Sequence, residues 1–105
     1  MRRACLIAAI ILLAGQAVAG QFTQQRQADL LNLLTQDCGS CHGLTMKGGL
    51  GPPLLPAVLA GKDDEALTEI ILDGLHGTPM PPWRPFLKPY EAAWMVQQLK
   101  EGLPK

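Results

Sequence analysis

The chain has few charged and aromatic residues and gives no strand signal. Charged residues make up 17% of the 105, aromatic residues make up 5%, and nine basic residues balance nine acidic ones. A neutral chain without basic clusters does not predict nucleic-acid binding. Apolar and polar residues do not alternate over any long stretch, so β-strands are not expected. The longest uncharged apolar run, Ala4 to Ala14, is eleven residues and falls short of the roughly 20 needed to span a bilayer.

The N-terminus has the pattern of a secretory signal peptide. Arg2 and Arg3 precede the apolar run, and Ala17-Val18-Ala19 places small residues where a signal peptidase cuts. We therefore expect residues 1–19 to be removed, residues 20–105 to form one domain, and the protein to lie in the periplasm without a stable membrane anchor. Cleavage would leave 105 − 19 = 86 residues with a formal charge of 7 − 9 = −2.

A domain this short needs a covalent or cofactor-based staple, because surface outgrows core as size falls. Cys38-Gly39-Ser40-Cys41-His42 is the covalent haem-attachment motif. Two thiols separated by two residues can add to the two vinyl groups of one porphyrin edge, and the next residue then brings an imidazole to the iron. The motif predicts one haem c, bound through Cys38 and Cys41, with His42 as an iron ligand.

Three other interpretations of the motif fit less well. A thioredoxin-like pair follows a strand, whereas a helical pattern precedes these cysteines. A structural zinc site needs four ligands, and beyond the leader only Cys38, Cys41, His42 and His76 are available. A disulfide between Cys38 and Cys41 would close too short a loop to stabilise the domain much.

The remaining pattern predicts an all-α protein in which long Gly/Pro-rich loops wrap the haem. Leucines recur at helical spacing before the motif, and capping residues bound two later helices. Loops as long as these are uncommon unless they enclose a ligand. In chain order we expect a frayed lead-in at 21–27 with Thr23 as a candidate N-cap, a helix over 28–37, a loop over 39–62, a helix from Asp63 or Asp64 to Gly74, a loop over 76–86, and a helix from Pro89 to Gly102.

The second axial ligand of the iron is predicted to be Met80. It lies between Pro79 and Pro81, in a loop whose prolines restrict the backbone and lower the entropy lost on folding. Met95, on the apolar face of the last helix, is interpreted as a core-filling residue. Met46 follows His42 too closely in the sequence to reach the face of the haem opposite His42. Ligation by His76 is the alternative and would give a lower reduction potential.

The helix that ends in Cys-x-x-Cys-His, the glycine- and proline-rich wrap and the last helix after Pro79-Met80-Pro81 resemble class I cytochromes c. The resemblance implies that a proline carbonyl accepts the proximal imidazole proton, and Gly51-Pro52-Pro53-Leu54 assigns this role to Pro52. Leu30 departs from the family, which often has glycine at this position of the first helix. The close crossing of the terminal helices is therefore expected to change.

A narrower resemblance covers most of the chain. The segment from Asp37 to Pro52, Ile71 to Gly74, and Gly77 to Phe86 with its Met80 loop are similar to the cytochrome c55X (NirC) group. This resemblance implies an electron carrier, not an enzyme, that reduces haem-cd nitrite reductase in denitrification. The alternative it implies is a maturation factor in d-type haem biogenesis or insertion; a small haem enzyme or ligand sensor would need an open iron site. We expect redox-protein partners and a monomer, with a dimer that exchanges the last helix through the Met80 loop left open.

Overall fold

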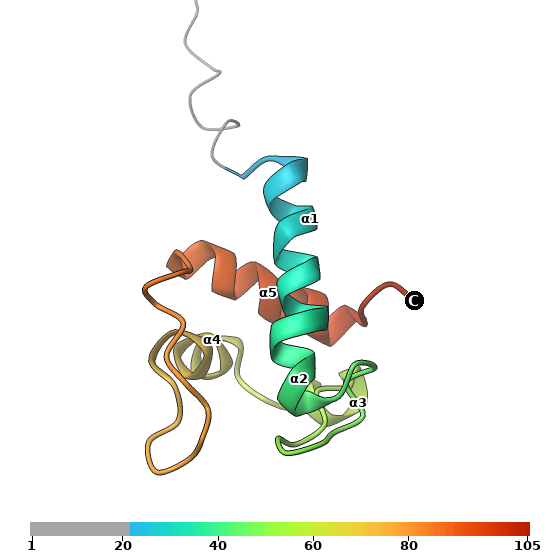
Figure 1. Ribbon diagram of the computed structural model, residues 1–105, viewed down its shortest axis with the longest axis vertical. Helices are drawn as coiled ribbons and strands as arrows, with labels where there is room; N and C mark the ends of the chain where they lie inside the picture. The colour runs from blue at the N-terminus through green and yellow to red at the C-terminus, as the bar shows by residue number, and fades with distance from the viewer. Residues whose placement is uncertain (1–21) are drawn as a thin grey trace, which may run out of the picture.

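The computed structural model describes residues 22–105, and in this range it is helical without strands (Figure 1). The all-α prediction is confirmed. The predicted leader, residues 1–19, lies outside the described residues. Within them, no helix is long and apolar enough to cross a membrane. The elements in chain order are α1 (Gln24–Leu33), η1 (Leu34–Cys38), α2 (Gly39–His42), α3 (Pro56–Leu59), α4 (Asp64–Asp73) and α5 (Pro89–Glu101).

The first helix starts earlier than predicted. Thr23 is its N-cap, and the Thr23 hydroxyl accepts a hydrogen bond of 3.0 Å from the Arg26 backbone N–H. Phe22 stands edge-on to Tyr90 and Trp94 of α5, with ring centroids 5.5 and 5.3 Å apart. The prediction of a frayed lead-in is therefore wrong for residues 24–27, because the cap and this aromatic contact hold the first turn.

The same helical rod continues through η1 and α2 to His42 (Figure 1). Residues Leu34–Cys38 form a π-helical turn, in which backbone hydrogen bonds join residues five apart in the sequence and not four apart as in an α-helix. The turn changes the register of the rod immediately before the cysteines. Periodic leucines predict a helix here but give no sign of this change.

The terminal helices meet in the core. Leu30 and Leu34 of the first rod share one buried cluster with Ala92, Met95 and Leu99 of α5. Leu30, Ala92 and Met95 are fully buried, so the leucine at position 30 is part of the core between the terminal helices. Truncating one such leucine to alanine typically costs about 2–5 kcal/mol. Burial of Met95 in this cluster agrees with its interpretation as a core residue.

The later helices follow their predicted boundaries. Asp63 caps α4, and its carboxylate accepts a 2.8 Å hydrogen bond from the Ala66 N–H. Gly74 ends α4 with φ +73°, and Gly102 ends α5 with φ +95°. Two short helices, α2 and α3, were not predicted within the 39–62 loop. Pro56 at the first turn of α3 is compatible with that turn because its missing N–H would have no helical partner there.

The haem-attachment site

The two cysteines of the motif lie at the end of the first helical rod. Cys38 closes η1 and is half-buried, whereas Cys41 lies in α2 and is exposed. Residues three apart on a helix share one face, so both thiols can reach one edge of a planar ligand. The two thiols are free and form no disulfide. Their spacing is that of a Cys-x-x-Cys-His motif, with His42 ending α2.

The surroundings of Cys38 do not suit a redox dithiol. Burial, with the nearby Asp37 carboxylate as a smaller cause, raises the pKa of the Cys38 thiol to about 11 in the chain without haem. Catalytic dithiols have lowered thiol pKa values, because the thiolate is the reactive form. A half-buried first cysteine that follows a helix, and not a strand, therefore does not match a thioredoxin-like pair.

The His42 ring is held in one orientation. Its Nδ1 lies 2.7 Å from the carbonyl oxygen of Pro52, ten residues later. A carbonyl only accepts hydrogen bonds, so Nδ1 carries the proton and the lone pair is on Nε2. Gly51 packs against the ring: a Cβ there would stand 2.8 Å from both Cε1 and Nδ1 of His42. Any side chain at position 51 would therefore push the imidazole.

The segment after His42 folds back onto the helix end. Gly51 N–H donates to the Cys41 carbonyl at 2.8 Å, and Gly48 N–H donates to the His42 carbonyl at 2.8 Å. A Cβ at Gly49 would lie 2.8 Å from the same Cys41 oxygen. The glycines of this loop thus permit a close backbone approach. As a result Gly51 and Pro52 lie beside the imidazole.

Met80 comes from the second long loop, between α4 and α5. Its carbonyl accepts from Leu75 N–H at 3.3 Å, and its own N–H donates to the Thr78 hydroxyl at 3.3 Å. Gly74 approaches the same carbonyl so closely that a Cβ would lie 2.7 Å from it. Met80 is half-buried, whereas His76 is exposed. The structure thus brings Cys38, Cys41, His42 and Pro52 together at one helix end and supplies Met80 from a separate loop.

Sequence reasoning missed the contacts that hold this second loop. The Arg84 guanidinium makes two hydrogen bonds to the Asp73 carboxylate, of 2.7 and 2.8 Å. The partners are eleven residues apart on two different elements, so no helical or strand periodicity signals the pair. The neighbouring Trp83 N–H donates to the Ile71 carbonyl at 3.0 Å.

The donor set fits a covalent haem c. Two free thiols lie three residues apart at one helix end, and an imidazole with an available Nε2 follows directly. Gly51 leaves space that a Cβ would fill against the imidazole. Among the described residues there is no cluster of three His, Cys, Asp or Glu side chains that suits a bare metal ion. The chemistry of the site is therefore that of porphyrin attachment.

Comparisons with known proteins agree with the site. The family model described as cytochrome c oxidase, cbb3-type, subunit III, matches residues 25–98. Cytochrome c55X of Paracoccus denitrificans is 54% identical over 90 residues, which cover 86% of this chain and 87% of the relative. The solved structure of a c-type cytochrome NirC superposes with a TM-score of 0.74 at 52% identity, covering 75% of this chain and 93% of that one.

A longer protein contains a similar part. The structure of dihydro-heme d1 dehydrogenase NirN in complex with DHE matches with a TM-score of 0.63 at 34% identity. The match covers 70% of this chain but only 16% of that one. The fold, the motif and the close relatives all lead to one assignment. This chain belongs to the cytochrome c55X family of c-type cytochromes and carries one haem c, covalently bound through Cys38 and Cys41.

Proposed function

We propose that this cytochrome carries single electrons in the periplasm to haem-cd nitrite reductase during denitrification. The observation that carries the proposal is the 2.7 Å contact between His42 Nδ1 and the Pro52 carbonyl. It holds the imidazole with Nε2 available as the proximal ligand and increases the basicity of the ring. When bound, haem c supplies the one-electron couple.

Met80 is the second axial ligand in this proposal. Its loop is held by the Leu75–Met80 backbone bond and by Gly74, whose missing side chain allows the close approach. Two protein ligands leave no open iron position for a substrate, so the site suits electron transfer and not catalysis. Thioether ligation raises the reduction potential relative to a second imidazole.

The surface for a redox partner lies beside the attachment segment. Leu50 is 95% exposed and Leu44 is 66% exposed, although the backbone of their loop is held by hydrogen bonds to Cys41 and His42. Exposed apolar side chains on a fixed loop provide contact area at little entropic cost. A formal charge of only −2 for residues 20–105 offers little electrostatic steering, so docking should be small and transient.

The test is direct electron transfer. The reduced holo-protein is mixed with haem-cd nitrite reductase without oxygen, nitrite is added, and reoxidation of the c-haem is followed by its visible spectrum. We expect fast reoxidation that depends on both enzyme and nitrite. The proposal fails if the haem stays reduced while an unrelated donor cytochrome is oxidised under the same conditions.

One observation favours a second function, in d-type haem maturation. The similar structure NirN is titled a dihydro-heme d1 dehydrogenase, and about a sixth of it resembles this chain. A separate cytochrome of this shape would suit electron exchange with such an enzyme. Deletion of the gene separates the roles: loss of d-type haem from nitrite reductase supports maturation, whereas intact but slowly reduced reductase supports the carrier.

A further inference from the structure

This inference rests on the proposed ligation by Met80 and concerns what holds that side chain in place. The loop from Gly74 to Trp83 leaves the C-terminal end of α4 and returns to it. On its return, Trp83 and Arg84 donate backbone hydrogen bonds of 3.0 and 2.9 Å to the carbonyls of Ile71 and Leu72. Met80 therefore lies within a loop whose two ends are joined to the last turn of one helix.

A side-chain contact joins the same two ends. Asp73 is the last residue of α4, and its carboxylate receives two hydrogen bonds from Arg84, from Nε at 2.7 Å and from Nη2 at 2.8 Å. Glu69, one turn earlier, lies 3.5 Å from the same Nη2. A bidentate guanidinium–carboxylate contact constrains orientation as well as distance. The bond from Arg84 also lowers the pKa of the Asp73 carboxyl, so the pair is charged at neutral pH.

Within the loop, Met80 has weaker restraints. Its backbone makes two hydrogen bonds of 3.3 Å, slightly longer than usual for an N–H···O bond. The Arg84–Asp73 pair closes the loop outside these bonds and reduces the number of conformations open to it. If only a fraction of the loop conformers places the Met80 thioether at the iron, the apparent affinity of Met80 for the iron falls in proportion to that fraction. An external ligand then displaces Met80 more easily.

We propose that Arg84 and Asp73 are positioning residues for Met80, and that their bidentate contact keeps the methionine loop closed for axial ligation. The pair is half exposed, with side-chain exposures of 48% and 53%, so water weakens it. Its contribution to the free energy of loop closure is therefore modest and similar to that of other exposed ion pairs with good geometry. The Arg84–Asp73 pair should therefore affect how easily Met80 is displaced from the iron, and not whether the protein folds.

The experiment measures displacement of Met80 by imidazole in the ferric holo-protein. The spectrum is titrated with imidazole, and the sulfur-to-iron charge-transfer band reports ligation by the thioether. For Arg84→Gln we expect the band to remain while imidazole binds about two- to fivefold more tightly. Asp73→Asn should act in the same direction, and Arg84→Lys should restore part of the wild-type value because it keeps the charge without the fork.

Lys100→Gln is the matched control. It removes another ion pair made by α4, between Lys100 of α5, which is 19% exposed, and Asp64 at the start of α4, which is 53% exposed and lies at the far end of the helix from the methionine loop. We expect its imidazole affinity to equal that of the wild type. A double-mutant cycle on Arg84 and Asp73 should be non-additive, because both substitutions remove one contact. Unfolding in urea is measured for each variant, so that general loosening is separated from loop opening.

Different outcomes refute different statements. Unchanged imidazole affinity in Arg84→Gln, or an equal change in Lys100→Gln, overturns the positioning role while leaving Met80 ligation intact. A wild-type protein that lacks the charge-transfer band, and whose imidazole affinity is unaffected by Met80→Ala, overturns the ligation and the positioning role together. Transfer of electrons to nitrite reductase is measured separately and does not enter this test.

Discussion

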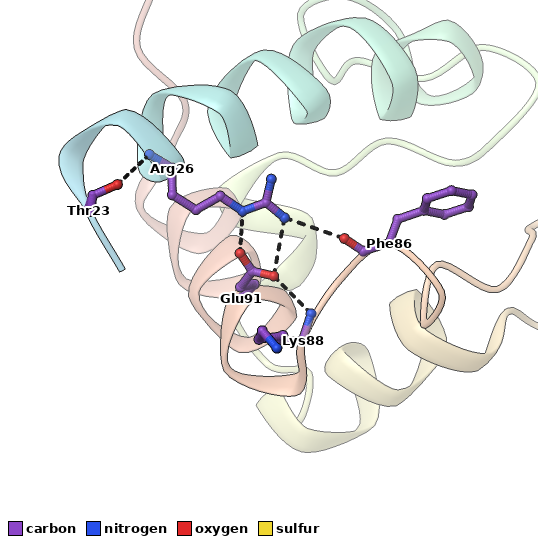
Figure 2. A network of polar contacts seen from close by, with 5 residues as sticks. All are labelled: Thr23, Arg26, Phe86, Lys88 and Glu91. Carbon is purple, nitrogen blue, oxygen red and sulfur yellow. Dashed lines mark hydrogen bonds and ion pairs between the residues drawn. The ribbon is translucent and has the colours of Figure 1, made fainter. Parts of the chain in front are cut away.

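Arg26 and Glu91 lie 65 residues apart in the sequence and form an ion pair that links the first turn of α1 to the first turn of α5 (Figure 2). Glu91 is only 3% exposed. Its Oε1 accepts from Arg26 Nη2 at 3.2 Å and from the Lys88 backbone N–H at 2.9 Å. Arg26 Nη2 also donates to the Phe86 carbonyl at 3.4 Å, so one guanidinium of α1 contacts α5 and the segment that joins the methionine loop to α5.

Replacing Arg26 with methionine should destabilise the holo-protein. The change keeps the bulk of the side chain but removes the hydrogen bonds from Arg26 to the buried Glu91 carboxylate. The carboxylate then keeps the hydrogen bond from the Lys88 backbone N–H. Because Arg26 is 35% exposed and solvent reaches the pair, we expect a loss of about 1–3 kcal/mol in the free energy of unfolding. Urea unfolding followed by circular dichroism measures it. Arg26→Lys is the control and should retain part of the stability.

The same pair should make stability depend on pH in the acid range. The hydrogen bond from Arg26 lowers the pKa of Glu91, the Lys88 N–H adds to this, and burial opposes it. A carboxyl whose pKa is lower in the folded state stabilises the fold fully above its unfolded pKa of about 4.3, and this contribution is lost as pH falls through the folded value.

We therefore expect the unfolding free energy of the wild type to fall below about pH 4.3, with a smaller fall in Arg26→Met. Urea titrations at several pH values measure both slopes. Equal slopes in the two proteins would show that Glu91 does not contribute to acid unfolding.

Gly51 should be intolerant of a side chain. In Gly51→Ala, the new Cβ would stand 2.8 Å from two atoms of the His42 ring, so the imidazole must turn away from the Pro52 carbonyl. We expect a higher reduction potential, because an imidazole without this hydrogen bond is a weaker donor to the iron, or a reduced yield of holo-protein, measured by redox titration and haem staining. Gly61→Ala is the control, since nothing lies within 4 Å of a Cβ there. An unperturbed potential in Gly51→Ala would refute the close packing.

Met80→Ala should open the iron. Loss of the thioether removes the sulfur-to-iron charge-transfer band, and the ferrous protein should then bind carbon monoxide readily. Met95→Leu is the control, because Met95 is fully buried among core residues and a leucine of similar volume should fill its place. If wild type and Met80→Ala bind carbon monoxide equally, the site is open from the start and the sensor or enzyme interpretation gains support.

The local parts of this structure could be predicted from the sequence. Cys38 to His42 identifies the attachment site, and Asp63, Gly74 and Pro89 identify helix ends, because each signal lies within a few adjacent residues. The contacts that were missed depend on tertiary structure. Arg84 meets Asp73 only after the methionine loop returns to α4, and Arg26 meets Glu91 only after the terminal helices cross.

The π-helical turn at Leu34–Cys38 was missed for a related reason. Leucines at positions 30, 31, 33 and 34 fit an α-helical period equally well, so propensity does not distinguish the two. Leu34, in this turn, is fully buried in the core cluster that also contains residues of α5. Sequence patterns describe which face is apolar but not how far the helix must turn to bury it.

Leu50 should contribute to partner docking and not to the fold. At 95% exposure its side chain buries almost nothing, so Leu50→Asn should leave the unfolding free energy within about 0.5 kcal/mol of wild type. If the loop beside the attachment motif is the contact surface, the same change should raise the apparent KM for nitrite reductase severalfold without altering the reduction potential. Val58→Asn on α3, where the valine is 42% exposed, is the control and should leave the KM unchanged. Equal effects of the two substitutions would show that general surface polarity, and not this loop, governs the encounter.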